Sequence, residues 1–398
     1  MRAMNRRAFL QQSLLLAGAV AGGACGWPRS VGAASPSLPF STEGRKLVIV
    51  QFGGGTRYDD TIGDRDHKFI PKLWRELVPR GAVFTNMRVE GKVVHPNSTG
   101  SILTGHWEWA DLDWSRPVAH PTVFEIYRRA SGGTDLKAWA FFYASILAQA
   151  GASLAPGFGP PFAANVVLPP TIPRETAEEM DRLMAIAATS GDEAAGTEAA
   201  RHCAALAWRT SRLEEGGLRS GAARDFTRDR YTKWKSGAGS TSHDAFLADC
   251  AIACMQEHAP DVLVVCFGEI DCAHYGSWSR YVEAVARTDA LTWRLWEAIE
   301  SLPAYRDQTL MLILPDHGRE LDHPDGLGFV HHSDFYTGAG EDEGCRHVWM
   351  VALGPDVPSG RVIEDSTPIT TVAATGLEYF TLRASEGAAK SIWHHLRR

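Results

Sequence analysis

The sequence lacks several features that would place it in other classes of protein. Its seven cysteines include no CxxC pair, and there are no internal repeats or low-complexity tracts. It has no lysine- and arginine-rich tract, and its formal net charge is -7, which argues against nucleic acid as a partner. What remains is ordinary globular composition, 44% hydrophobic and 22% charged over 398 residues, with room for a large core.

The chain also lacks an apolar run long enough to span a bilayer. Its N-terminal apolar stretch is short, rich in Gly and Ala, and preceded by Arg6 and Arg7. This resembles a twin-arginine signal with a small-residue cleavage site in "SVGAAS". We therefore expect loss of residues 1–33, folded export through the twin-arginine machinery, a periplasmic location, no membrane span in the mature chain and a mature net charge of about −11. The alternatives are lipidation at Cys25 and an ordinary buried N-terminal helix.

The pattern of apolar runs predicts an α/β fold. Runs typical of buried parallel strands lie at 46–52, 262–268, 308–315 and 347–355, with one or two further strands in 81–94. Helices are expected at 71–78, in "NSTGSILTGHWEW", at 242–258 and at 278–300. Strands that alternate with helices indicate a mostly parallel sheet with helices on both faces.

Composition divides this fold into two parts. Residues 45–150 and 245–398 carry the strand and helix pattern and are assigned to the sheet domain. Residues 151–245 begin with Pro/Gly-rich connectors and continue with Ala-rich helical spacing, so we interpret them as a helical insertion or cap.

Polar clusters flank three of the expected strands. Their members are Asp271 and His274 after 262–268, Asp316 and His317 after 308–315, and His331 and His332 before 347–355. Loops beyond the carboxyl ends of parallel strands carry the chemistry of such sheets. Carboxylate and imidazole together suit a borderline divalent ion, zinc first and manganese as an alternative, so we expect one or two ions here. For any single Asp-His pair, a hydrogen-bonded loop histidine is the alternative.

The motifs and their order resemble the alkaline phosphatase superfamily, a fold shared by phosphodiesterases, phosphomutases and sulfatases. "IDCAHYG", "LILPDHGRE" and "HH" followed by "HVWMVALGPDV" carry the resemblance, and "NSTGSILTGHWE" is similar to the helix after the family's nucleophile. The resemblance covers about 45–150 and 245–380. It implies one metal site of Asp271, His274 and either His331 or His332, and another that includes Asp316 and His317.

Two positions depart from the family pattern. The family's metal-binding Asp at the end of the first strand is replaced by Phe52 or Gly53, and Asp59 or Asp60 would have to fold back to supply it. The family spacing, counted back from "TG" at 104–105, places the nucleophile at a histidine, His95.

The nearest hydroxyls, Ser98 and Thr99, lie one helical turn after His95. Either is a candidate nucleophile activated by a neighbouring metal ion, although "PNST" also suits a helix N-cap. His95 is a candidate metal ligand or general acid/base. Arg57 and Arg319 are candidates for binding an anionic ester oxygen, with surface ion pairs as the alternative.

These features predict an exported metal-dependent hydrolase of phosphate esters, a phosphodiesterase or phosphatase that uses a hydroxyl nucleophile at a two-metal site. Its substrate is expected to be a small phosphate or sulfate ester. A sulfatase or phosphomutase is the alternative on the same fold, although the sulfatase pattern Cys/Ser-x-Pro-x-Arg is absent. A degenerate member that binds a metal or ligand without turnover is a further alternative.

Overall fold

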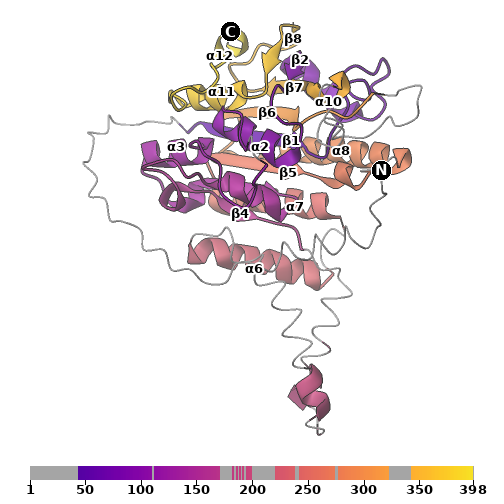
Figure 1. The fold of residues 1–398 in the computed structure, drawn as a ribbon, viewed down its shortest axis with the longest axis vertical. Coiled ribbons are helices and arrows are strands. Elements are labelled where there is room, and N and C mark those ends of the chain that lie inside the picture. The colour runs from indigo at the N-terminus through magenta and orange to yellow at the C-terminus, as the bar shows by residue number, and fades with distance from the viewer. Residues whose placement is uncertain are drawn as a thin grey trace, which may run out of the picture. The chain divides into compact units, whose positions relative to one another are not determined.

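The computed structural model describes residues 44–109, 112–170, 220–237, 242–273, 277–321 and 342–397, with scattered positions between 182 and 199. These residues all belong to one compact unit, Phe40–Arg398. Figure 1 shows a central sheet with helices packed on it.

The strands are β1 (Lys46–Phe52), β2 (Ala82–Arg88), β3 (Ala138–Phe142), β4 (Asn165–Val167), β5 (Val262–Phe267), β6 (Thr309–Pro315), β7 (His347–Leu353), β8 (Arg361–Ile363) and β9 (Thr367–Pro368). The α-helices are α2 (His95–Thr104), α3 (Val123–Ser131), α6 (Gly221–Lys235), α7 (His243–His258), α8 (Trp278–Ser301), α10 (Glu343–Arg346), α11 (Thr371–Tyr379) and α12 (Trp393–Leu396). One short π-helix is η1 (Leu73–Leu77). The short 3₁₀ helices are η2 (Val78–Arg80), η3 (Asp135–Lys137), η4 (Ser145–Gly151), η5 (Pro160–Phe162) and η6 (Glu269–Ala273).

The sheet is mostly parallel, as the sequence predicts. Its strand order is β4-β3-β5-β1-β6-β7-β2-β8, with β9 paired to β2, and within the described chain β7 is antiparallel to both of its neighbours. β1 lies between β5 and β6 and is parallel to both, with Phe52 opposite Phe267 on one side and Pro315 on the other. The carboxyl ends of these three strands therefore meet at one edge of the sheet.

Helices cover both faces of the sheet, because its central strands are apolar on both sides. Val48 and Val50 of β1 pack in a cluster with α7 and α8, whereas Leu47 and Ile49 pack in a second cluster with α2, α3 and α11. This alternation follows from the two-residue period of a strand. Every residue of β1 is buried, which explains why its sequence is a continuous apolar run.

The four strands predicted from apolar runs are confirmed as β1, β5, β6 and β7, and segment 81–94 contributes one strand, β2. Two strands have no counterpart in the sequence prediction: β3, whose short "AWAFF" segment lies beside β5, and β4, which pairs with β3. β4 lies within 151–245, so that part of the expected insertion belongs to the sheet. Helix α6, also within 151–245, packs Phe226 against Trp139 of β3.

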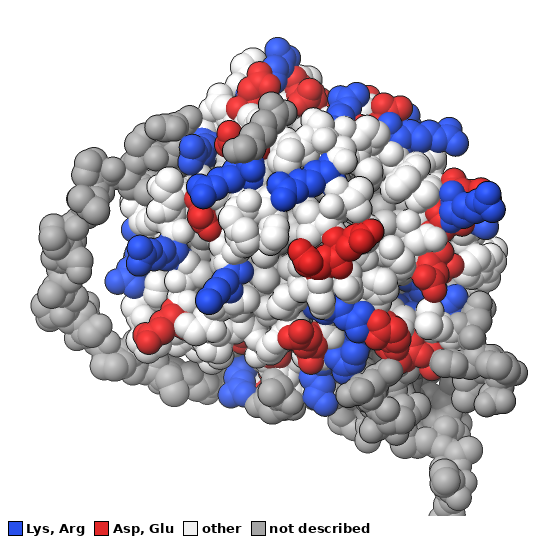
Figure 2. Space-filling view, turned by 90° about the horizontal axis from the view of Figure 1, so that it is seen from above, with Lys and Arg blue, Asp and Glu red and all other residues white. Residues whose placement is uncertain are grey.

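Acidic and basic side chains are interspersed on the face in Figure 2, so the net negative charge is not gathered there. None of the helices in the described ranges is long and apolar enough to cross a membrane. Cys250, Cys254, Cys266 and Cys345 are buried free thiols.

Candidate metal centre

His95 lies at the start of helix α2, at the edge where β1, β5 and β6 end. Val94 precedes the helix in an extended conformation and makes no side-chain cap, and Pro96 occupies the first turn, where its missing N–H is tolerated. The N-capping alternative for "PNST" is therefore not realised. His95 is 7% exposed, and its imidazole is directed at the residues that follow β6.

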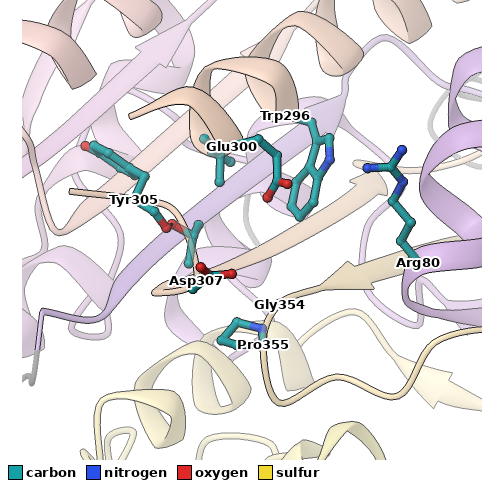
Figure 3. Close-up of a pocket in the computed structure, with 9 residues that line it drawn as sticks. Arg80, Trp296, Glu300, Tyr305, Asp307, Gly354 and Pro355 are labelled. Carbon is teal, nitrogen blue, oxygen red and sulfur yellow. Dashed lines mark hydrogen bonds between the residues drawn. The ribbon is translucent and has the colours of Figure 1, made fainter. Parts of the chain in front are cut away.

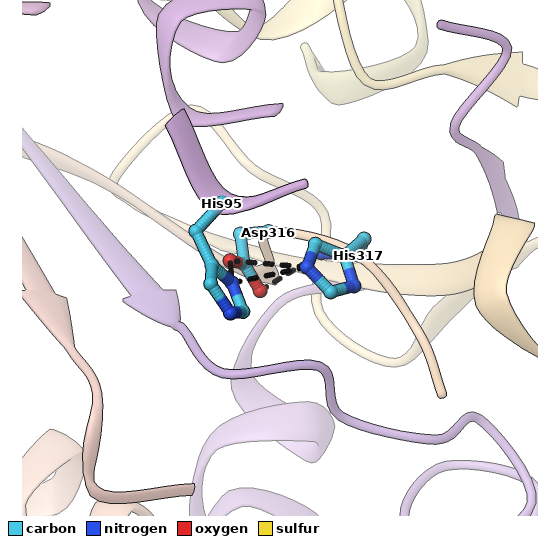
Figure 4. A group of neighbouring side chains, drawn as sticks. All are labelled: His95, Asp316 and His317. Carbon is cyan, nitrogen blue, oxygen red and sulfur yellow. Dashed lines mark hydrogen bonds and ion pairs between the residues drawn. The ribbon is translucent and has the colours of Figure 1, made fainter. Parts of the chain in front are cut away.

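Three donor atoms converge at this edge (Figure 4). His95 Nδ1 is 2.6 Å from Asp316 Oδ2 and 3.0 Å from His317 Nε2. Ligand atoms from His95, Asp316 and His317 all lie within 4.8 Å of one another, and all three residues are buried. The structure thus brings together one predicted Asp-His pair and His95, the residue to which the spacing of the sequence resemblance assigns the nucleophile.

The hydrogen-bond chemistry of the three residues fits a divalent cation. His317 Nδ1 lies 2.8 Å from the Gly318 carbonyl and must donate its proton there, which leaves a lone pair on Nε2. Burial lowers the pKa of His317 to about 4, so the ring is neutral. A single proton on His95 Nδ1 would have to be shared between the Asp316 carboxylate and the His317 lone pair. A cation placed among the three residues would instead be bound by a lone pair from each of them.

Asp271 lies beside this group and contacts the other nitrogen of His95. It belongs to the turn η6, and its Oδ1 is 3.3 Å from His95 Nε2. A carboxylate in this position fixes the orientation and tautomer of a metal-binding histidine. Direct metal ligation by Asp271 remains a prediction, because its carboxylate is not part of the group of three described above.

Two glycines, Gly54 and Gly55, lie just after the first strand, close to where the sequence resemblance implies a metal-binding Asp. The backbone N–H groups of Gly54 and Gly55 lie 3.5 and 3.4 Å from the Asp316 carboxylate. Gly54 has a φ of +108°, and a Cβ there would lie 2.3 Å from the Asp271 nitrogen, so only glycine fits. Asp59 is exposed, and Asp60 lies 3.9 Å from Arg57, so neither joins the three donors.

Arg319 holds the loops of the site together. Its buried guanidinium donates to the carbonyls of Gly54, Gly55, Ile270 and Ala273 at 2.8 to 3.3 Å. It therefore joins the loop after β1 to the turn η6. The sequence makes Arg319 a candidate for binding an anionic ester oxygen, whereas these contacts give it a structural role.

A second set of hydrogen bonds fixes the start of the turn η6. The buried carboxylate of Asp244 accepts the N–H groups of Gly268 and Glu269 at 2.8 and 2.9 Å. The Glu269 carboxylate in turn accepts hydrogen bonds from the Ser242 hydroxyl and the Arg287 guanidinium. Burial raises the pKa of Asp244 to about 7.

The two candidate hydroxyls are both fully buried in α2. Thr99 Oγ1 donates to Gln51 Oε1 of β1 at 3.1 Å, and Ser98 Oγ has no hydrogen-bond partner within the described ranges. A substrate outside the protein has no access to either oxygen. The remaining predicted ligands, His274, His331 and His332, lie outside the described residues.

Sequence reasoning missed Tyr143, which follows β3 at the same edge. Its ring meets the His95 ring edge to face, with centroids 6.0 Å apart. Gly268 makes room for it, since a Cβ there would lie 2.0 Å from Tyr143 Cγ. Burial, together with the charges of Asp271 and Asp316, raises the pKa of Tyr143 well above its ordinary value, so the phenol keeps its proton.

Metal binding at this site should release a proton from His95. Burial alone would lower the pKa of His95, but the charges and hydrogen bonds of Asp271 and Asp316 outweigh it and raise this pKa to about 10. The raised pKa keeps His95 protonated at neutral pH without metal, so we expect zinc affinity to rise about tenfold per pH unit between about pH 7 and 9. Competition with a chromophoric chelator measures this slope, and a flat profile would contradict ligation by His95.

No protein-family model matches the sequence, and no curated protein matches it. Several solved structures do match it. A phosphonate monoester hydrolase of Agrobacterium radiobacter is 16% identical, with a TM-score of 0.53 over 88% of this chain and 77% of that chain. A phosphonate monoester hydrolase from Silicibacter pomeroyi is 12% identical, with a TM-score of 0.51 over 88% and 76%.

BT1596, a 2-O GAG sulfatase, is 11% identical, with a TM-score of 0.51 over 89% of this chain and 74% of that chain. At sequence identities this low, the similarity to these structures shows a shared fold and nothing more. The chain has the fold of the alkaline phosphatase superfamily, as the order of its motifs predicts.

Proposed function

We propose that this chain is a metal-dependent hydrolase of phosphate esters, a phosphodiesterase or phosphatase. The convergence of His95 Nδ1, Asp316 Oδ2 and His317 Nε2 at the carboxyl edge of the sheet carries the proposal. The fold, which hydrolases of phosphonate and sulfate esters share, supports it. The absence of the sulfatase nucleophile pattern favours phosphate over sulfate.

His95, Asp316 and His317 would hold the metal ion. When bound, a divalent ion supplies Lewis-acid stabilisation of negative charge on the ester oxygens. Asp271 keeps the His95 ring in place, and the N–H groups of Gly54 and Gly55 do the same for Asp316. The protonated phenol of Tyr143 is suited to donate a hydrogen bond to an ester oxygen that gains charge.

We further propose that water, rather than a protein hydroxyl, attacks phosphorus. Ser98 and Thr99 are fully buried and Thr99 is bonded to Gln51, so a covalent intermediate on either would require the helix to open. The side chain of Asp271 is 29% exposed, so in this proposal its carboxylate accepts a proton from the attacking water. The P–O bond to the alcohol breaks as the new P–O bond forms, and the departing alcohol oxygen takes a proton from solvent.

The decisive experiment uses purified protein of full zinc occupancy, and then of full manganese occupancy. Turnover of bis-p-nitrophenyl phosphate and p-nitrophenyl phosphate should exceed that of p-nitrophenyl sulfate. Absence of turnover with all three esters at full occupancy would instead favour the non-catalytic alternative, which the missing first-strand Asp and the buried hydroxyls also support.

The Ser98→Ala variant tests the choice of nucleophile. We expect kcat to stay within about twofold of the parent, because Ser98 has no contact with substrate in this proposal. Stability should rise by about 1 kcal/mol, since the change removes a buried hydroxyl without a hydrogen-bond partner. A loss of kcat of about 1,000-fold or more would restore Ser98 as the nucleophile.

A further inference from the structure

Helix α8 contributes side chains to two separate places beside the sheet. Near its C-terminal end, Trp296 and Glu300 line a surface cavity of about 150 Å³ that lies where β6 begins (Figure 3). Arg287 lies about 20 Å earlier along the same helix and binds Glu269 of the turn η6. Because η6 carries Asp271, the contacts around Arg287 concern the metal centre, whereas the cavity takes no part in it.

The start of η6 and the start of helix α7 exchange hydrogen bonds. Asp244, in the first turn of α7, accepts the N–H of Gly268 on Oδ1 at 2.8 Å and the N–H of Glu269 on Oδ2 at 2.9 Å. In return, the Glu269 carboxylate accepts the Ser242 hydroxyl and, at 3.2 Å, the Asp244 N–H. N–H groups at the start of a helix have no partner within that helix, so each segment supplies the acceptors that the other needs.

This exchange places two carboxylates side by side at low exposure. Asp244 is 1% exposed, and the side chain of Glu269 is 18% exposed. Such a pair is unfavourable unless a positive charge lies close to it. The Arg287 guanidinium of α8 supplies that charge, because it donates to Oε2 of Glu269 and also, at 2.7 Å, to Glu283.

The exchange reaches the metal centre through Asp271. The backbone of Gly268 links the two, because its N–H is held by Asp244 and its carbonyl accepts the Asp271 N–H at 3.0 Å. Asp271 Oδ1 then lies 3.3 Å from His95 Nε2. A shift at the start of η6 would therefore move the carboxylate that orients the His95 ring.

We propose that Asp244, Glu269 and Arg287 are positioning residues of the metal centre. They act on zinc binding through Asp271, so this inference rests on the metal-binding part of the proposed function and not on ester hydrolysis. Partners that orient a metal-binding histidine typically contribute about 10- to 100-fold to metal affinity. Asp244 must be a carboxylate, because each of its oxygens accepts a different N–H, whereas asparagine offers one acceptor oxygen and an NH₂ group.

A double-mutant cycle on zinc affinity tests whether Asp244 acts through Asp271. Chelator competition with zinc alone is measured at pH 8, above the pKa of about 7 to which burial raises Asp244. We expect Asp244→Asn and Asp271→Asn each to lower the affinity about tenfold. The double variant should then be within about twofold of Asp271→Asn, since no Asp271 carboxylate is left to position. Independent effects that multiply to about 100-fold, or an unchanged affinity in Asp244→Asn, would overturn the proposal.

Arg287→Met repeats the cycle at a partly exposed position, where the change leaves the core intact. It should lower zinc affinity about threefold or more in the parent and have no further effect in Asp271→Asn. Glu283→Gln is the matched control, because Glu283 contacts the same guanidinium from α8 rather than from η6 and is 68% exposed. Equal losses in Arg287→Met and Glu283→Gln would assign the effect to general surface charge and overturn the proposal.

The melting temperatures of the metal-free variants separate a displaced turn from a lost fold. The expected cycle in a protein that hydrolyses no ester would support the positioning role and reject the hydrolase. An additive cycle in an active hydrolase would reject the positioning role alone. Absence of zinc binding by the parent protein would overturn both.

Discussion

Replacing His317 by alanine should lower zinc affinity by more than about 100-fold and remove ester hydrolysis. The Nε2 lone pair is available only because Nδ1 donates to the Gly318 carbonyl, and the ring is fully buried. Chelator competition measures the affinity, and metal analysis after dialysis measures the occupancy.

His394→Ala is the control for this variant, because His394 is exposed at the far C-terminal helix α12. It should retain both zinc and activity. The melting temperature of the metal-free His317→Ala protein separates loss of the site from loss of the fold. Full zinc occupancy in a folded His317→Ala protein would show that the three donors are not the metal site.

Replacing Arg319 by methionine should lower the free energy of unfolding by about 3–5 kcal/mol. Methionine fills a similar volume but donates no hydrogen bond. The four buried carbonyls that accept from Arg319 would lose this donor, and they belong to Gly54, Gly55, Ile270 and Ala273. The loop after β1 and the turn η6 lose their connection, so zinc affinity should fall as well. Urea unfolding measures the first effect and chelator competition the second.

Arg294→Met serves as the comparison. Arg294 is also an arginine that contacts an acidic group, but its ion pair with Asp249 is 44% and 40% exposed at the surface. Such a pair contributes less than about 1 kcal/mol. If both variants lose the same small amount, Arg319 does not hold the loops together.

The sheet edge that carries the site could be predicted because its strands are buried on both faces. Such strands have continuous apolar sequences, so β1, β5 and β6 are visible as runs that end in polar residues. Parallel pairing then brings those ends together. The strands β3 and β4 were missed because five and three residues are too few for a clear pattern.

The accessibility of the candidate nucleophiles depends on contacts that the local sequence does not encode. Spacing along the chain placed His95 at the start of the helix and Ser98 and Thr99 one turn later. Whether a hydroxyl there is open to substrate depends on Gln51, 48 positions earlier in the chain, which accepts the Thr99 hydrogen bond. Side-chain contacts of this kind have no local sequence pattern.

The sequence by itself determined the α/β class, the strands that bring polar loops to one edge, and the Asp316-His317 pair, because these follow from short-range periodicity and residue chemistry. Tertiary structure alone decided that His95 joins that pair, that Asp271 contacts its far nitrogen, and that Arg319 holds the loops. It also brought Asp244 and Arg287 from two helices to the turn that carries Asp271. Each of these depends on distances between residues from separate segments, which are set only when the sheet and its helices pack together.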